Sequence, residues 1–211
     1  MCCVSLLPAE WELRLVDENV ERLTDADLRW ADYVMLSAMI VHKTAVSEIV
    51  DRCRGVGTPI IAGGPLFTTG HAAFPDIDHF VLGEAEEILP QVIEDMRRGT
   101  VRHTYAASSR PDIACVPSPR WDLIDMRKYV TMSVQFSRGC PFDCEFCDII
   151  VMNGRVPRTN WSPSWRNFVY VAGKEPSSSS TTTSSATKGR PRYFFGSSSN
   201  GKRRPAPRWD S

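Results

Sequence analysis

The chain has 211 residues, of which 42% are hydrophobic, so it can bury one sizeable core or two small ones. Its net charge of zero hides an asymmetry, because residues 1–160 carry a formal charge of −7 and residues 161–211 one of +7. The opening MCCVSLLPAEWELRLVD lacks the features of a signal peptide, and no stretch is apolar enough to cross a membrane, so we expect a cytoplasmic protein without membrane contact.

Strand and helix patterns alternate along the first hundred residues. Strands are predicted at 12–17, 32–39, 58–64 and 79–84, and helices at 24–31, 44–54 and 85–98. Thr24 precedes acidic first-turn residues, as an N-cap does. The helix at 44–54 has Val46, Ile49, Val50 and Cys53 on one face, and Gly55 and Gly57 follow it as stop signals. The alternation predicts an α/β fold with a Rossmann-like, doubly wound parallel sheet in residues 1–100.

The carboxyl ends of the predicted strands indicate where a ligand binds in such a sheet. The strand-end residues are Asp17, Ser37, Gly63, Gly64, Gly83 and Glu84. The glycines have two interpretations: they let a flat or phosphorylated ligand approach the backbone, or they only make tight turns between strand and helix.

Residues 101–128 contain several prolines and little periodicity, so they are predicted to be a linker. The strand pattern at 129–137 then leads directly into the stretch GCPFDCEFC. In a chain whose seven cysteines are expected to stay reduced, this cluster indicates metal or redox chemistry rather than disulfides.

The spacing of Cys140, Cys144 and Cys147 suits three ligands of an iron–sulfur cluster, with one iron left open. A zinc site is the main alternative, although the chain holds no cysteine or histidine after Cys147, and upstream His103 and Cys115 show no ligand spacing. A thioredoxin-like pair would leave Cys140 unexplained.

The cysteine loop resembles the C-x3-C-x2-C loop of the radical S-adenosylmethionine enzymes, with Phe146 directly before the last cysteine. Other stretches are similar to the class of these enzymes that carries an N-terminal cobalamin-binding, Rossmann-like domain: LVDENV, DYVMLSAMIV, AGGPLFTTGH, HFVLGEAEE, PRWDLID and SVQFSRGCPFDCEFCDII. The resemblance covers roughly residues 7–160. It implies that residues 129–160 begin a radical S-adenosylmethionine β/α barrel.

The resemblance also implies a mechanism. The three cysteines of the loop would hold a [4Fe–4S] cluster, whose open iron chelates S-adenosylmethionine close to Phe146. Electrons from a reducing donor would cleave the sulfonium, and the resulting 5′-deoxyadenosyl radical would act on an unactivated carbon of a small-molecule substrate. Cobalamin in the strand-end site, formed by Ser37, Gly63, Gly64, Gly83 and Glu84, would deliver a methyl group.

The sequence departs from the family pattern in two places. The turn Asp17, Glu18, Asn19 contains no histidine, so any corrin would bind without a ligand from it, and the family's usual opening strand is missing. The other histidines are interpreted as surface or turn residues, and the other cysteines as packing or solvent thiols: His42, His71, His79, His103, Cys2, Cys3, Cys53 and Cys115.

Residues 161–211 are basic, rich in Ser, Thr and Pro, and predicted to be disordered. Relatives in the class carry a strand resembling VFIVDDNFIGNK. If its first eleven codons end in C and the lysine codon is AAA before a purine, reading one base later gives SSSSTTTSSATK, the sequence of residues 177–188. The hypothesis is that the segment from about residue 161 is an out-of-frame translation. The nucleotide sequence of the gene decides this hypothesis.

These features predict a truncated cobalamin-dependent radical enzyme that would bind iron poorly and not cleave S-adenosylmethionine. One alternative is a Rossmann-like module that binds a corrin or nucleotide without catalysis. Another is a zinc-containing nucleic-acid binder, in which the basic tail would use Tyr193, Phe194 and Phe195 to stack bases, although nucleic acid is the less favoured partner.

Overall fold

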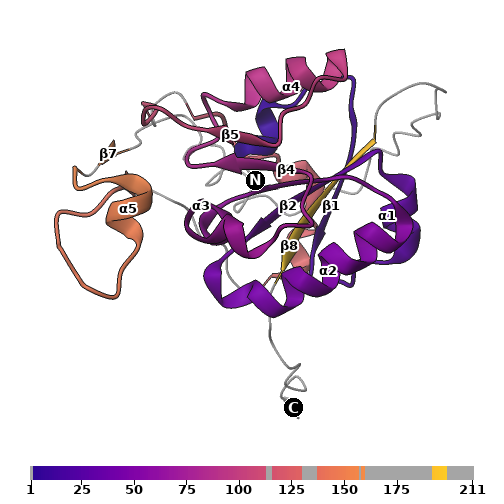
Figure 1. The fold of residues 1–211 in the computed structure, drawn as a ribbon, viewed down its shortest axis with the longest axis horizontal. Coiled ribbons are helices and arrows are strands. Elements are labelled where there is room, and N and C mark those ends of the chain that lie inside the picture. Colours follow the sequence, from indigo (N-terminus) through magenta and orange to yellow (C-terminus); the bar gives the residue numbers. More distant parts are fainter. Residues whose placement is uncertain (1, 113–115, 130–136, 157, 160–191, 199–211) are drawn as a thin grey trace, which may run out of the picture.

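The structure is a computed structural model, and it describes residues 2–112, 116–129, 137–156, 158–159 and 192–198. Its main element is a six-stranded sheet of order β1-β8-β2-β3-β4-β5, in which every neighbouring pair is parallel. Helices cover both faces of this sheet (Figure 1). The predicted α/β architecture with a parallel, Rossmann-like sheet is therefore confirmed.

The strands of the main sheet are β1 (Glu12–Asp17), β2 (Tyr33–Ala38), β3 (Ile60–Gly63), β4 (His79–Leu82), β5 (Thr104–Ala106) and β8 (Arg192–Ser198). A short antiparallel pair is formed by β6 (Ser137–Arg138) and β7 (Arg158–Thr159). The α-helices are α1 (Asp25–Trp30), α2 (Lys43–Val56), α3 (Pro65–Gly70), α4 (Leu89–Arg98) and α5 (Ile149–Asn153). Short 3-10 helices are η1 (Cys2–Leu6), η2 (Ile40–His42), η3 (His71–Ala73), η5 (Trp121–Leu123) and η6 (Met126–Lys128).

The core has two layers because successive side chains of a strand point to opposite faces of the sheet. Val34 and Leu36 of β2 pack in the cluster that also contains the buried residues of α1, α2 and α3. Met35, between them, packs in the second cluster, with residues of η1 and α4. The near-continuous apolar run of β2 is thus explained by burial on both faces.

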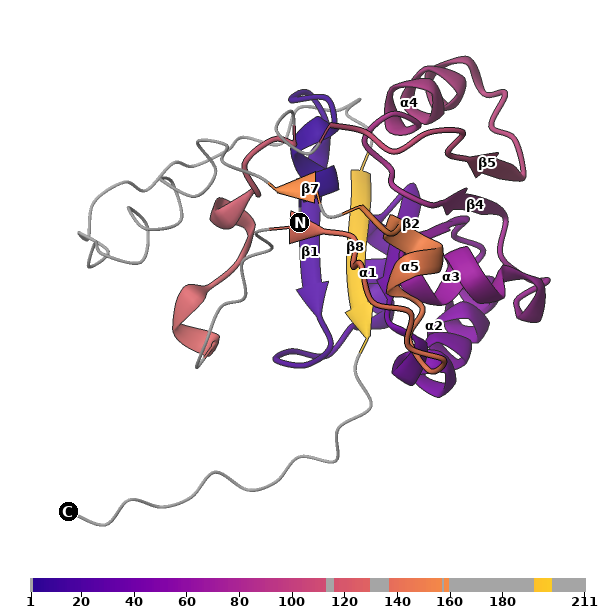
Figure 2. The same ribbon diagram turned by 90° about the vertical axis from the view of Figure 1, so that its left-hand side faces the viewer.

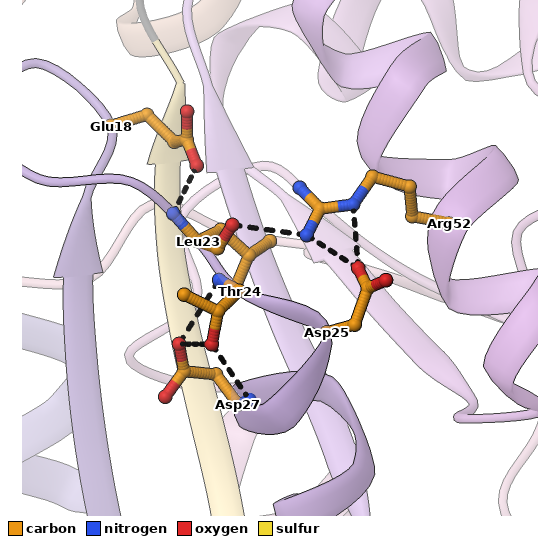
Figure 3. A network of polar contacts seen from close by, with 6 residues as sticks. All are labelled: Glu18, Leu23, Thr24, Asp25, Asp27 and Arg52. Atoms are coloured by element: carbon orange, nitrogen blue, oxygen red, sulfur yellow. Dashed lines mark hydrogen bonds and ion pairs between the residues drawn. The ribbon is translucent and has the colours of Figure 1, made fainter.

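The first helix begins at a capping box, which the sequence had indicated through Thr24 (Figure 3). The Asp27 amide donates to Thr24 Oγ1 over 3.2 Å, and the Thr24 amide donates to Asp27 Oδ2 over 3.0 Å. Arg52 of α2 donates to Asp25 Oδ1 and to the carbonyl oxygen of Leu23, which ties the start of α1 to α2. The two bonds of the capping box satisfy amides that a helix start would otherwise leave without partners.

The second helix has the predicted buried face, formed by Val46, Ile49, Val50 and Cys53. Gly55 was predicted to stop this helix, and this is wrong, because the helix continues through Gly55 to Val56. It ends at Gly57, whose φ of 82° is the left-handed conformation of a C-cap glycine.

The linker predicted for residues 101–128 contains a strand that the sequence did not indicate. In β5, Thr104 lies opposite Phe80 of β4, and Tyr105 is 3% exposed. The Tyr105 hydroxyl donates to Asp95 Oδ2 of α4 over 2.7 Å. The prediction of a linker was therefore wrong at residues 104–106. A strand of three residues is too short for the alternation of its side chains to be recognised in the sequence.

The prediction of disorder for the whole of residues 161–211 is wrong at residues 192–198. These residues form β8, which lies between β1 and β2 and is paired with both over six positions (Figure 2). The segment contains consecutive Tyr193, Phe194 and Phe195, residue types with high strand propensity, and the two flanking strands provide its backbone partners. Residues 160–191 and 199–211 lie outside the described part.

The strand predicted at 129–137 also falls mostly outside the described residues. Its last residue, Ser137, lies in β6, opposite Thr159 of β7. The start of a β/α barrel in residues 129–160 therefore remains a prediction.

We expect Thr24→Ala to lower the free energy of unfolding by about 1 kcal/mol, because it removes the side-chain half of the capping box. Urea unfolding followed by circular dichroism measures the change. Thr44→Ala, at an exposed position in the first turn of α2, is the matched control and should change stability by less than about 0.5 kcal/mol. Equal midpoints for the two variants would show that the box does not stabilise the fold.

Candidate functional site

A cavity of about 310 Å³ lies where β2, β3 and β4 end. The parallel register explains its position, because Ser37 lies opposite Gly63, and Gly63 lies opposite Val81. All five residues predicted to bind a ligand line this cavity: Ser37, Gly63, Gly64, Gly83 and Glu84. The structure thus brings together residues that are up to 47 positions apart.

Asp17, the remaining strand-end residue, does not line the cavity. It ends β1, which is separated from β2 by β8, and its carboxylate accepts hydrogen bonds from the Asn19 amide and the Tyr129 hydroxyl. The turn that follows β1 is therefore closed by its own polar contacts.

The cavity is lined by both apolar and polar side chains. The apolar ones include Met35, Ile61, Val81 and Leu89. The polar and charged ones are Ser37, Thr68, Glu84, Glu86, Arg138 and Asn153. A site of this kind suits a flat apolar group that carries hydrogen-bonding substituents at its edge.

Two cavity residues from η1, Cys3 and Val4, were not predicted to be part of the site. Cys3 had been interpreted as a packing or solvent thiol, and it is half-buried and lines the cavity. No motif marks it, because its position depends on the packing of η1 against the sheet and α4.

The glycines at the end of β3 are explained by packing between protein segments. Gly64 has a φ of 90°, and a Cβ on it would lie 2.8 Å from Ser37 Oγ. A Cβ on Gly63 would lie 3.1 Å from the carbonyl oxygen of Val81. Both contacts are with the neighbouring strands, which supports the tight-turn interpretation of these two residues.

Thr68 joins the two loops at the cavity. Its hydroxyl donates to the Gly64 carbonyl oxygen over 3.0 Å and accepts from the Gly83 amide over 3.1 Å. The turn after β3 and the turn after β4 are therefore held in a fixed relation, which preforms one side of the cavity.

The most strongly shielded ion pairs of the described residues are formed by side chains that line the cavity. Arg138 Nη1 is 2.7 Å from Glu84 Oε2, and Arg138 Nη2 is 2.7 Å from Glu86 Oε1. The three side chains are 13%, 7% and 10% exposed, respectively. Burial alone lowers the pKa of Arg138, but the hydrogen bonds to the two carboxylates outweigh this effect and hold the pKa above its usual value.

Arg138 stands two residues before the first cysteine of the loop, so this contact joins the loop to the main sheet. Gly139 has a φ of 95°, and a Cβ on it would lie 2.5 Å from the carbonyl oxygen of Val156. The Cys140 amide donates to the Gly154 carbonyl oxygen over 3.1 Å, which closes the base of the loop. The loop and α5 stand at the left of Figure 1.

The three thiols are suited to metal binding by type and are not gathered around one point. Cys140, Cys144 and Cys147 are free, Cys144 is exposed, and the other two are half-buried. Across residues 2–112 and the other described ranges, no group of three His, Cys, Asp or Glu side chains is arranged to hold a metal ion. Phe146, beside Cys147, is 92% exposed.

The other thiols and histidines contribute little to the site. Cys53 is fully buried in α2, and burial raises its pKa to about 11, which keeps it a protonated packing residue. His79 and His103 contact the backbone carbonyl oxygens of Arg102 and Asp78, respectively. His79 lies in strand β4 rather than in a turn. Cys115 lies outside the described residues.

Within the described part of the chain, none of the helices combines the length and apolar character needed to cross a bilayer.

Comparison with known proteins identifies methyltransferases as relatives. The chain is 43% identical over 160 residues to an uncharacterized methyltransferase of Synechocystis sp., which covers 73% of this chain and 29% of the relative. It is 33% identical over 156 residues to the hopanoid C-2 methylase of Rhodopseudomonas palustris, which covers 72% of this chain and 30% of the relative. It is 25% identical over 158 residues to the bacteriochlorophyllide d C-8(2)-methyltransferase of Chlorobaculum tepidum, which covers 68% of this chain and 33% of the relative.

The chain thus spans about a third or less of the length of these curated relatives. No family model matches the chain, and no solved structure matches it.

We expect Gly64→Ala to destabilise the fold by roughly 1 to 3 kcal/mol, because alanine strains the backbone at a φ of 90° and its Cβ collides with Ser37. Gly70→Ala is the matched control, since Gly70 has a φ of −138° and its Cβ would contact nothing within 4 Å. Thermal unfolding of both variants measures the difference. Equal stability would show that the turn after β3 tolerates a side chain.

Proposed function

We propose that this chain forms the corrinoid-binding and cluster-binding part of a radical S-adenosylmethionine methylase. The proposal is supported by the homology to methylases and, above all, by one structural observation. The cavity at the carboxyl edge of the parallel sheet shares its wall with the base of the C-x3-C-x2-C loop, through Arg138, Met152 and Asn153. The cavity and the loop that carries three thiols are thus adjacent.

In this proposal, Cys140, Cys144 and Cys147 hold a [4Fe–4S] cluster with one open iron. When bound, the cluster supplies the electron that cleaves S-adenosylmethionine and generates a 5′-deoxyadenosyl radical. The chain's own role is to present the three thiols on a loop whose base is fixed by Gly139 and Arg138. Phe146 is available to cover bound S-adenosylmethionine, since its ring is 92% exposed.

The cavity would hold part of a cobalamin. A volume of about 310 Å³ is at the small end of the range for small-molecule sites, so only an edge or a substituent of a corrinoid enters it. Ser37 offers a hydroxyl group to such a substituent, and the apolar side chains of Met35, Ile61 and Val81 would exclude water. No histidine stands in the turn Asp17–Asn19, so we propose binding without a protein ligand to cobalt from this turn.

The relatives suggest the class of substrate. Two of them are named for a hopanoid and a bacteriochlorophyllide, both polycyclic molecules. We propose that the whole protein methylates an unactivated carbon of a polycyclic small molecule, with electrons from a reducing donor.

A second candidate function is a binding module that holds a corrin or nucleotide without catalysis. The arrangement of the thiols favours it, because the cavity is formed while the three cysteines are not gathered around a common point.

Anaerobic reconstitution with iron and sulfide tests the cluster. We expect the chain to take up iron and sulfide, at low occupancy, with the broad visible absorbance of a [4Fe–4S] cluster, and Cys144→Ser to lose most of this absorbance because one thiolate is removed. Cys53→Ser is the control, because Cys53 is buried in α2. A colourless chain that retains zinc would contradict the proposal and support a zinc site.

Titration with hydroxocobalamin tests the cavity. We expect Ser37→Trp to weaken binding by about tenfold or more, because the indole fills the cavity, while Ser47→Trp on the exposed side of α2 leaves it unchanged. Changes in the corrinoid absorption spectrum report the dissociation constants. Binding that is equal in both variants, or absent in the unmodified chain, would contradict the assignment of the cavity.

A further inference from the structure

We propose that Arg138 is a positioning residue that couples the cavity at the sheet edge to the cysteine loop, so that a ligand in the cavity reduces the mobility and reactivity of the loop thiols. The inference rests on the proposed function for the identity of the ligand. It deepens that function, because it names the contact through which the two cofactor sites influence each other.

The contact of Arg138 with Glu84 and Glu86 has a defined geometry. Arg138 donates from two different guanidinium nitrogens to carboxylates of Glu84 and Glu86, each over 2.7 Å. Arg138 belongs to β6, and the two glutamates belong to the turn between β4 and α4. A planar guanidinium that binds two separate acceptors fixes its direction as well as its distance.

The contact of Arg138 with the two glutamates is buried. The three side chains are no more than 13% exposed, whereas the other ion pairs of the described residues each have at least one side chain that is 44% exposed or more. A shielded pair is screened little by salt, and loss of one partner leaves uncompensated buried charge. This contact therefore holds the loop much more firmly than a surface pair would.

The same contact forms part of the cavity wall. Glu84, Glu86 and Arg138 line the cavity, and so do Met152 and Asn153 at the far end of the cysteine loop. The two ends of the loop are joined by the bond from the Cys140 amide to the Gly154 carbonyl oxygen. A ligand that occupies the cavity thus contacts both ends of the segment that carries the three thiols.

Thermodynamic linkage makes this coupling reciprocal, because a ligand that favours the docked loop is itself bound more tightly when the loop is docked. Arg138→Ala is therefore expected to weaken ligand binding and to free the loop at the same time.

Hydrogen exchange of the full chain tests the contact without any cofactor. We expect Arg138→Ala to speed amide exchange in residues 139–156 on the order of tenfold or more, since the two carboxylates then lose their shared cation. Glu86→Gln is the second variant, because it removes one ion pair while keeping the side-chain shape, and it should have a smaller effect of the same sign. Arg155→Ala is the matched control, since Arg155 lies on the same loop and pairs with Asp143 at the surface, where their side chains are 60% and 69% exposed.

Alkylation of the loop thiols by iodoacetamide, with and without hydroxocobalamin, tests the coupling. We expect hydroxocobalamin to slow alkylation of Cys140 and Cys147 by about fivefold or more in the unmodified chain and in Arg155→Ala, and to have little effect in Arg138→Ala. Peptide mass spectrometry locates the modified thiols, and circular dichroism checks that each variant is folded.

The outcomes separate the two proposals. Hydroxocobalamin that binds without changing thiol reactivity, or exchange in Arg138→Ala that equals that of Arg155→Ala, would overturn the role of Arg138 and leave the proposed function intact. Hydroxocobalamin that does not bind to the unmodified chain would overturn the proposed function, and the coupling with it. Protection of Cys140 and Cys147 from alkylation by hydroxocobalamin supports the inference if it disappears in Arg138→Ala and persists in Arg155→Ala.

Discussion

The parallel register of β2, β3 and β4 is the constraint on which the candidate site depends. Because all three strands run in the same direction and pair in this register, Ser37, Gly63 and Gly83 reach the same edge of the sheet. The following turns are then fixed by the left-handed conformation of Gly64 and by the hydroxyl of Thr68. The cavity is thus a consequence of backbone geometry, and its side chains only decide what it can accept.

The sequence predicted the strands and helices that have a clear pattern or cap signal, and it missed α3, β5 and β8. β1 and α2 were found because alternation over six residues and a buried helical face over four turns are clear signals. The helix α3 has six residues and β5 has three, too few for a period to be recognised. β8 was not predicted, because its three aromatic residues stand alone in a polar, irregular tail and its backbone partners are two strands that lie far away in the sequence.

The candidate site was predicted in part. The strand-end residues were found because the topology of a doubly wound sheet fixes where the strands end. Arg138 was missed, since a contact between a residue before the cysteines and two glutamates more than 50 positions earlier leaves no trace in local spacing. An arginine followed directly by the cysteine loop and the acidic stretch EAEE after β4 were the available signals, and only three-dimensional packing joins them.

The position of β8 has a consequence for biosynthesis. During translation, β1 and β2 leave the ribosome long before residues 192–198 are made, yet these two strands are joined only through β8. Until then both strands present free backbone groups along one side, a state that invites association with other nascent chains or capture by chaperones. Closure of this gap pairs segments separated by most of the polypeptide, so it is expected to be the slowest step in forming the sheet.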